Sequence, residues 1–352
     1  IIYTALLLII YRLQSKIMSS SYKKPGFDSK YFEQLLNSLP ALESKTIAIT
    51  GTTSGMGFIA AEACARLGAK VILLNRPSPR SDASFAKLKM NVSNAQFYKV
   101  DCDLQSFESV RASIEVINEL CPEGLNVLCN NAGIMAFRDE PTIDGYDVQM
   151  QTNHLSHFLL TKLLMPKLEE AAEKYGEARV VNHSSVARHQ QKELKSEYLE
   201  SRGGKLGGDG SSMFFSGARW VRYSQTKLAN AAFTACLHEK FQKSNSKLKA
   251  MVAHPGLAES DLQSSSVKDG GMGSFFTRYL MKLGQSEKDG SLGLVRCIAD
   301  PKINSGVIVG PGLRGLKGKA KAFPLEKFYD NDNTKSLLWS KSWEAISEEF
   351  NI

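Results

Sequence analysis

A glycine-rich turn between a buried strand and a helix constrains the fold of this chain more than any other feature. The apolar run 46–50 (TIAIT) predicts a buried strand, the turn 51–57 (GTTSGMG) follows it directly, and 58–67 has the apolar spacing of a helix. Glycines let a backbone turn sharply and approach a pyrophosphate, and the following helix presents unpaired N–H groups to it. The order strand, glycine turn, helix therefore indicates a dinucleotide site at the start of an α/β domain.

Short apolar runs continue to alternate with longer helical stretches along the chain. Further strands are predicted at 70–74, 96–100, 125–129, 179–182, 249–253 and 306–309, and helices at 83–91, 106–120, 145–175, 223–241 and 334–350. This alternation predicts a single doubly wound Rossmann-type domain, with a central parallel sheet of about seven strands and helices on both faces. In such sheets ligands bind beyond the carboxyl ends of the strands, where the polar clusters of this chain fall.

The domain organisation follows from length and composition. With 352 residues, 43% of them hydrophobic, the chain can bury one large α/β core, and no linker or abrupt shift in composition divides it. We therefore expect an N-terminal apolar segment and helical lead-in at 1–43, a catalytic nucleotide-binding domain at 44–325, and a C-terminal helical tail at 326–352.

Charge and cysteine content restrict the partners and the compartment. The net charge of +8 is scattered, with one cluster at Lys317, Lys319 and Lys321, which supports solubility or attraction to anionic cofactors or membrane surfaces and argues against a nucleic-acid partner. The six cysteines contain no C-x-x-C pair and are interpreted as reduced and structural. We expect a cytoplasmic protein, or a membrane-associated one that faces the cytosol.

The first residues are apolar but short for a membrane span. Ile1 to Tyr11 is followed by Arg12 and Lys16, whereas a helical span needs roughly 20 apolar residues. Three interpretations remain open: the remnant of a membrane anchor, a signal-like segment, or translated leader ahead of a start at Met18. No small-residue cleavage pattern supports secretion.

Tyr223 and Lys227 share one face of the predicted helix 223–241 and are candidates for proton transfer. A phenol with an ordinary pKa of about 10 is a poor acid or base near neutrality, and an ammonium one turn away favours the phenolate. An ordinary amphipathic helix is the alternative interpretation, because this pair alone is common by chance. Other motifs must therefore support the assignment.

Those motifs stand in one order along the chain. They are Thr50-Gly51 with Gly55 and Gly57, Asn130-Asn131-Ala132-Gly133, Asn153, Ser184-Ser185, Tyr223 with Lys227, and Pro255-Gly256. Over residues 44–262 the chain resembles the short-chain dehydrogenase/reductase family. Within it, 152–158 (TNHLSHF), 227–230 (KLAN) and 254–256 (HPG) resemble the branch of retinol dehydrogenases, the WW-domain oxidoreductase and the light-dependent protochlorophyllide reductases.

The resemblance implies an enzyme that interconverts a carbonyl and an alcohol. By it, Tyr223 is the general acid or base, and Lys227 lowers the pKa of the phenol and binds the nicotinamide ribose. Ser185, the second serine of its pair, polarises the substrate oxygen. Asn153 holds a water that links Lys227 to solvent.

The resemblance and the end of the second strand together imply NADP(H). Asn75 is neutral where enzymes that prefer NAD usually have a carboxylate, and Arg76 can form a charge-assisted contact with a 2′-phosphate. The cofactor contacts implied are Gly51, Thr53, Ser54, Gly55, Met56, Gly57, Asn75, Arg76, Asp103, Leu104, Asn131, Ala132, Gly133, Tyr223, Lys227, Pro255, Gly256 and Ser260. No metal is expected, since His154 and His157 lack a third ligand.

Two segments depart from the family pattern or vary within it. Ser185 and Tyr223 lie 38 positions apart, more than in typical members, and the insert 189–219 between them is interpreted as a lid or substrate-recognition loop, or alternatively as a surface insertion. The region 257–285 has an apolar patch that fits a substrate pocket, a membrane contact or plain core. We expect a sizeable apolar small-molecule substrate such as a retinoid, steroid or lipid aldehyde or ketone.

Two alternative functions remain open at this stage. One is a double-bond reductase of the protochlorophyllide type, which uses the same Tyr/Lys pair. The other is a non-catalytic NADP-binding regulator or scaffold, which predicts damage among Ser185, Tyr223, Lys227 and Asn153, and all four are intact. Peripheral or N-terminally anchored membrane association and a homodimer are compatible with the sequence, and no nucleic-acid partner is expected.

Overall fold

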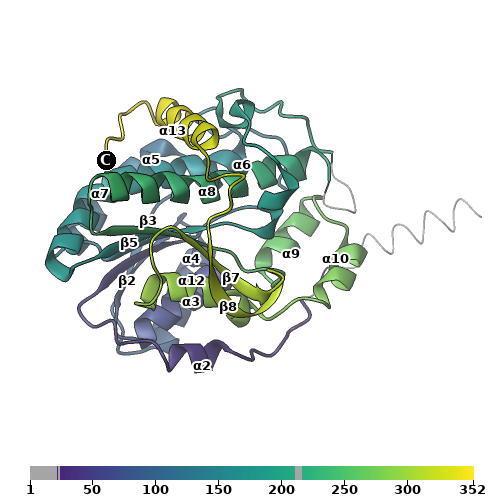
Figure 1. The fold of residues 1–352 in the computed structure, drawn as a ribbon. Coiled ribbons are helices and arrows are strands. Elements are labelled where there is room, and N and C mark those ends of the chain that lie inside the picture. Colours follow the sequence, from purple (N-terminus) through teal and green to yellow (C-terminus); the bar gives the residue numbers. More distant parts are fainter. Residues whose placement is uncertain (1–21, 23, 211–215) are drawn as a thin grey trace, which may run out of the picture.

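A single twisted sheet forms the centre of the protein, seen in the computed structural model in Figure 1. The structure describes residue 22, residues 24–210 and residues 216–352. In these residues the strand order is β3-β2-β1-β4-β5-β6-β7-β8. The strands are β1 Thr46–Thr50, β2 Lys70–Asn75, β3 Phe97–Asp101, β4 Val127–Asn130, β5 Ala178–His183, β6 Leu248–Ala253, β7 Val307–Leu313 and β8 Lys317–Pro324. All neighbouring strands are parallel except β7 and β8.

Helices cover both faces of this sheet (Figure 1), as the predicted doubly wound fold requires. The α-helices are α2 Phe32–Leu36, α3 Gly55–Arg66, α4 Pro79–Asn91, α5 Phe107–Leu120, α6 Val148–Met150, α7 Ser156–Tyr175, α8 Ala218–Lys243, α9 Asp261–Lys268, α10 Ser274–Met281, α11 Glu287–Gly290, α12 Leu292–Ala299 and α13 Asp332–Ile346. Short 3-10 helices occur at Val186–Gln190 and Ser196–Leu199. Among the helices of the described residues, none is both long and apolar enough to cross a bilayer.

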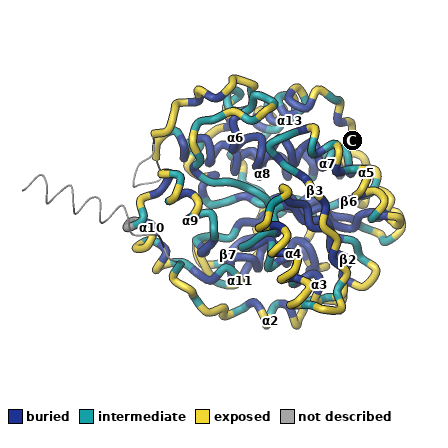
Figure 2. The backbone as a smooth tube through the Cα atoms, turned by 180° about the vertical axis from the view of Figure 1, so that it is seen from behind, coloured by how far each residue is buried: buried dark blue, intermediate teal, exposed yellow. Residues whose placement is uncertain are grey.

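The two faces of the sheet bury two separate apolar cores. One core joins α5, α7, α8 and α13, and the other joins α2, α3 and α12. Figure 2 shows the buried backbone concentrated along the sheet and the inner helices, with the exposed residues at the periphery. Since central strands of a parallel sheet are covered on both faces, continuous apolar runs such as 46–50 were informative in the sequence.

The order of the strands reverses beside β1. The chain moves outward from β1 to β2 and β3, and then returns to β4 on the other side of β1. The carboxyl ends of β1 and β4 therefore border a topological switch point, where ligands bind in sheets of this kind. The glycine turn lies at this position.

The structure adds an eighth strand and breaks one predicted helix. Strand β8 pairs antiparallel with β7 and contains the predicted lysine cluster; its Lys and Gly content obscured its strand character in the sequence. The helix predicted over 145–175 begins at Val148 and contains a π-helical segment at Gln151–Leu155. Such bulges are often found at functional sites.

The C-terminal tail packs on the main core through aromatic rings. The Phe158 ring on α7 lies 5.1 Å from the ring of Trp339, 5.2 Å from that of Phe350 and 5.1 Å from that of Phe233, measured between centroids. Phe158 is fully buried. Aromatic contacts of this kind stabilise a core beyond the burial of their area.

We predict that Phe158→Ala lowers the free energy of unfolding by about 3–5 kcal/mol, because it leaves a cavity among three rings. Urea denaturation measures this change. Met90→Ala, at a side chain that is 77% exposed, is the matched control and should change the midpoint little. Equal midpoints for Phe158→Ala and the unmodified chain would contradict the packing described.

Candidate active site

The glycine turn leaves an open space at the first residue of α3. A Cβ at Gly51 would lie 2.7 Å from Ala132 Cα, and one at Gly57 would lie 2.3 Å from the Gly51 oxygen, so both positions are closed by backbone. Gly55 has a positive φ of 60°, and a Cβ there would meet nothing within 4 Å. The turn therefore packs against the backbone at Gly51 and Gly57, and it is open at Gly55, where α3 begins. This arrangement fits a phosphate group held by helical N–H groups.

Asn131 secures the turn from β4. Its side-chain amide donates to the main-chain oxygens of Thr50, at 2.8 Å, and Gly51, at 3.1 Å. The Thr50 hydroxyl in turn accepts from the N–H groups of Asn131 and Ala132. The side chain of Asn131 therefore holds β1 and β4 together at the switch point and fixes the shape of the glycine turn.

Asn75 and Arg76 differ in their surroundings at the end of β2. The Asn75 side chain is buried, accepts from Thr52 N–H at 2.8 Å and donates to the Thr52 hydroxyl at 2.8 Å, so it fixes the turn from the other side. Arg76 is exposed. Arg80 donates to Ser54 and pairs with Asp261 at 2.7 Å. This second cation was missed because the predicted helix began at 83, whereas α4 begins at Pro79.

The other predicted cofactor contacts line the carboxyl ends of the strands. Asp103 accepts from Gln105 N–H at 3.0 Å, and the Leu104 carbonyl accepts from Ser156 at 2.7 Å. Gly256 has a φ of 65° and packs against the Leu316 carbonyl. The implied contacts Thr53 and Ser54 belong to the glycine turn, Met56 is buried on α3, Pro255 and Gly256 follow β6, and Ser260 caps α9.

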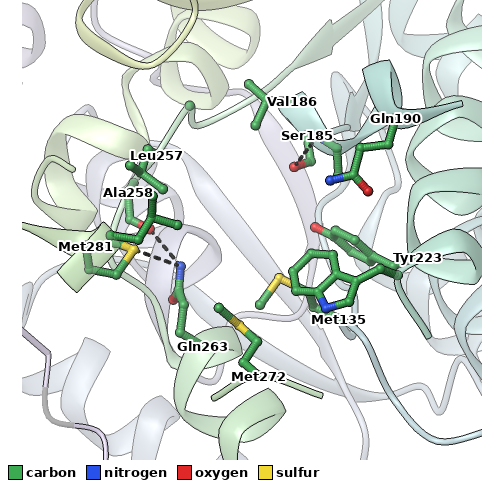
Figure 3. Close-up of a pocket in the computed structure, with 14 residues that line it drawn as sticks. Met135, Ser185, Val186, Gln190, Tyr223, Leu257, Ala258, Gln263, Met272 and Met281 are labelled. Carbon is green, nitrogen blue, oxygen red and sulfur yellow. Dashed lines mark hydrogen bonds between the residues drawn. The ribbon is translucent and has the colours of Figure 1, made fainter. Parts of the chain in front are cut away.

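Ser185, Tyr223 and Lys227 come together where β5 ends and α8 begins. Figure 3 shows the hydroxyl groups of Ser185 and Tyr223 directed toward each other at one end of a cavity. The two serines of the pair differ: Ser184 donates to the Lys227 carbonyl at 2.6 Å, inside the fold, whereas Ser185 lines the cavity. The Lys227 ammonium lies 5.7 Å from the centre of the Tyr223 ring and donates to the His183 carbonyl at 3.1 Å.

Burial dominates the electrostatics of this pair. It raises the pKa of Tyr223 to about 12, against the opposing effect of a hydrogen bond with Ser185. Burial also lowers the pKa of Lys227 to about 8. The sequence led us to expect that Lys227 lowers the pKa of the phenol. In the protein alone burial has the larger effect, and both groups are shifted toward their neutral forms.

Asn153 joins the glycine-containing segment after β4 to α8. Its side-chain oxygen accepts from Ile134 N–H at 2.8 Å, and its amide donates to the Ile134 carbonyl at 3.0 Å and the Thr226 hydroxyl at 2.9 Å. It lies in the π-helical segment. A Cβ at Gly133 would come within 3.0 Å of the Asn153 oxygen and 3.3 Å of the Lys227 nitrogen. The side chain expected to hold a water therefore has protein partners and positions the neighbours of Lys227.

An Arg/Glu pair supports the Ser185 loop from the far end of the chain. Arg188 donates to the Ser185 carbonyl at 2.9 Å, and its guanidinium forms two bonds, of 2.7 and 3.1 Å, with the Glu326 carboxylate. Burial acts to raise the pKa of Glu326, but hydrogen bonds from His189 and Arg188 lower it to about 2. No sequence pattern predicts this contact, because the two residues lie too far apart along the chain to share a local motif.

The cavity beside the two hydroxyls is mainly apolar. Its lining includes Met135, Trp220, Leu257, Met272, Leu280 and Met281. Gln263 also lines the cavity, and its amide donates to the Ala258 carbonyl at 3.0 Å (Figure 3). Because methionine side chains adapt to irregular shapes, three of them in one lining suit a large flexible apolar ligand.

The described part of the insert 189–219 is fixed to the domain. The fully buried Arg222 donates to the carbonyls of Leu206 and Gly208, at 3.1 and 2.8 Å, and pairs with Asp147 at 3.1 Å. Apart from Gln190, the cavity lining includes none of its described residues. The aromatic residues Phe214 and Phe215, near the end of the insert, lie outside the described residues. The part that the structure describes therefore acts as a packed support.

The histidines near the site do not converge on a metal. His154 bonds Ser342 at 2.8 Å, and His157 bonds Thr50 at 2.8 Å. Burial lowers the pKa of His154 to about 3 and of His157 to about 4, so both rings are neutral. The residues that the structure describes contain no group of three side chains able to hold a metal ion.

The chain is similar to dehydrogenases both in a family model and in individual relatives. The model of the short chain dehydrogenase family matches residues 45–207. The chain is 30% identical to human retinol dehydrogenase 12 over 314 residues, which is 87% of each chain. It is 32% identical to human polyprenol dehydrogenase over 223 residues, 63% of each chain.

Solved structures agree with this result. A putative uncharacterized protein from Mycobacterium paratuberculosis superposes with a TM-score of 0.67 at 29% identity, covering 90% of this chain and 98% of that one. L-sorbose reductase from Gluconobacter frateurii, solved with NADPH and L-sorbose, has a TM-score of 0.53 at 20% identity, covering 74% and 91%. At 20% identity, the similarity to L-sorbose reductase shows a shared fold only.

The buried ammonium predicts a specific pH dependence of stability. Below about pH 8 Lys227 is charged in both the folded and the unfolded state, and the folded state bears the full cost of burying the charge. As the pH rises from about 8 to the ordinary pKa of 10.5, the folded state loses the proton first. We predict that the unfolding free energy of the unmodified chain rises over this range relative to that of Lys227→Met. Parallel curves from urea denaturation would contradict the burial effect.

Proposed function

The chain belongs to the short chain dehydrogenase family, a family of oxidoreductases, and we propose that it is an NADP(H)-dependent enzyme that interconverts a carbonyl and an alcohol on an apolar substrate. One observation carries the proposal: the hydroxyls of Ser185 and Tyr223 meet at the end of an apolar cavity, with Lys227 one helical turn beyond. Hydroxyl groups at the end of an otherwise apolar pocket are positioned to bind one oxygen atom of a ligand.

The residues provide what carbonyl reduction requires at the substrate oxygen. A bound nicotinamide supplies the hydride. Negative charge then develops on the oxygen, where the Ser185 hydroxyl donates a hydrogen bond and Tyr223 donates a transferable proton. Burial raises the pKa of Tyr223 to about 12, so the phenol is protonated at neutral pH, and the negative charge that develops on the substrate oxygen would accept its proton. In the oxidation direction the phenolate would accept the proton, and the Lys227 ammonium would stabilise it.

The cofactor preference rests on the charges at the end of β2. The position at the end of β2 is the neutral Asn75 and not a carboxylate, and hydrogen bonds with Thr52 hold its side chain. The adjacent Arg76 is exposed and available to bind a phosphate. Arg80 provides a second cation at Ser54, beside the open space of the glycine turn. An NAD-specific site would place a carboxylate near the ribose hydroxyl. These features favour NADP(H), and the NADPH bound to L-sorbose reductase is consistent with them.

The substrate class rests on the cavity and on two relatives. The lining is mainly Met, Leu, Ala and Trp. The names of the similar human proteins refer to retinol and polyprenol, alcohols with long apolar chains. We infer a retinoid, steroid or lipid aldehyde or ketone.

We predict that Tyr223→Phe abolishes turnover while NADPH binding is retained, because only the transferable proton is lost. The assay follows NADPH absorbance with retinal, steroid ketones and long-chain aldehydes, and fluorescence titration measures NADPH binding. Near-normal turnover in Tyr223→Phe would contradict the assignment. An unmodified chain that binds NADPH but reduces none of these carbonyls would favour the regulator or scaffold.

We predict that Arg76→Gln raises the Michaelis constant for NADPH about tenfold to a hundredfold, the loss expected for a charge-assisted hydrogen bond. The constant for NADH should change little, since NADH lacks the 2′-phosphate. The control is Lys89→Gln, which removes an exposed cation on α4, away from the end of β2. Equal effects of Arg76→Gln on the two cofactors would exclude a phosphate contact.

A further inference from the structure

Two segments of the chain contain cations and no acidic residue. Residues 270–284 include Arg278 and Lys282, and residues 311–323 include Arg314, Lys317, Lys319 and Lys321; neither segment has an Asp or Glu. None of these six side chains forms an ion pair with another described residue. Elsewhere the exposed cations often have carboxylate partners, as with Lys99 and Asp82. Positive charge is therefore uncompensated at these two segments.

Large apolar side chains are exposed in the same two segments. Tyr279 is 67% exposed and Leu283 is 60% exposed in and after α10, while Leu313 and Leu316, at the turn between β7 and β8, are 58% and 45% exposed. We call Arg278, Tyr279, Lys282, Leu283, Leu313, Arg314, Leu316 and Lys317 the basic–apolar surface. Apolar side chains interleaved with uncompensated cations distinguish this surface from a solvated polar face.

Hydrogen bonds through Gln285 join the two segments. Its side chain accepts from Gly318 N–H at 2.8 Å and donates to the Pro255 carbonyl at 2.9 Å. Leu257 N–H donates to the Leu316 carbonyl at 2.8 Å. The end of α10 and the turn between β7 and β8 therefore lie side by side, at the side of the molecule where Figure 1 shows α9 and α10.

The same elements form one wall of the apolar cavity. Leu280 and Met281 of α10 line it, and so does Leu257, whose N–H donates to the Leu316 carbonyl; Figure 3 shows Leu257 and Met281 on the same side of the cavity. The basic–apolar surface thus lies directly outside the cavity wall.

The N-terminal end of the described chain is attached on this side as well. Lys24 pairs with Asp261, the first residue of α9, at 2.5 Å, and Gly26 N–H donates to Glu259 at 2.8 Å.

We propose that the basic–apolar surface docks on an anionic lipid membrane, from which the apolar substrate enters the cavity. Lys and Arg side chains attract anionic headgroups, and Tyr and Leu enter the interface between headgroups and acyl chains. Exposed leucines contribute nothing to binding of a nucleic-acid backbone, so the composition favours lipid over nucleic acid. Substrate entry rests on the proposed function, whereas docking does not.

Vesicle co-sedimentation of the full chain, without cofactor or substrate, tests the docking. The probes are vesicles of phosphatidylcholine alone and vesicles that also contain phosphatidylserine. We expect binding to the second kind only, weakened by salt. Lys282→Gln/Lys317→Gln should reduce the partition constant on the order of tenfold or more. Tyr279→Ser/Leu283→Ser should reduce it at any salt concentration, because it removes apolar contacts.

The control is Lys87→Gln/Lys89→Gln, which removes two exposed charges from α4, a helix that packs near β3 at the other edge of the sheet from β8. It should bind vesicles almost as well as the unmodified chain. Equal losses in the control and in the surface variants, or vesicle binding that both surface variants retain, would overturn the proposal. So would retention on an RNA or DNA oligonucleotide without vesicle binding.

A kinetic measurement separates docking from catalysis. With a water-soluble carbonyl, the surface variants should keep the turnover of the unmodified chain, while with retinal supplied in phosphatidylserine vesicles their Michaelis constant should rise. Tyr223→Phe should show the opposite pattern, with vesicle binding retained and turnover lost. Equal Michaelis constants for vesicle-borne retinal in surface variants and unmodified chain would overturn substrate entry at this surface.

Discussion

The removal of one phenol and one ammonium from water is the constraint on which the candidate active site depends. Tyr223 and Lys227 lie one turn apart on α8, and each is 4% exposed. Burial raises the pKa of the first and lowers that of the second, because it disfavours the charged form of each group. A proton donor in this condition loses its proton only when negative charge develops beside it. The fold therefore has to keep water out of this place and still admit a ligand.

Three parts of the chain, far apart in sequence, meet that requirement. The Asn153 side chain ties the segment after β4 to Thr226 on α8. Arg188, held by Glu326 from the C-terminal part, fixes the carbonyl of Ser185. Arg222 fixes the described part of the insert against α8. Each bond is made to backbone or to a neighbour of a candidate catalytic group, which leaves the hydroxyls of Ser185 and Tyr223 free to meet a ligand.

The parts that sequence could predict are those with a local cause. The strand 46–50, the glycine turn and the helix after it follow from apolar runs and backbone freedom over a few residues. The antiparallel β8, the cation Arg80 and the bond between Arg188 and Glu326 depend on what lies opposite in space. The effect of burial on the pKa of Tyr223 could not be predicted either, because burial is a tertiary property.

The distribution of positive charge also could not be predicted from the sequence, because it depends on which segments are neighbours in space. In the sequence the net charge of +8 looked scattered, and only the lysines of 317–321 stood out. In the structure the turn after β7 meets the end of α10 through Gln285, and two unremarkable segments become one surface that lacks carboxylates. That surface adjoins the wall of an apolar cavity whose ligand would be poorly soluble in water. Attraction to an anionic bilayer would bring the cavity close to the lipid in which such a ligand is concentrated. The positive charge of the surface and the apolar lining of the cavity would then both favour binding of a ligand that is poorly soluble in water.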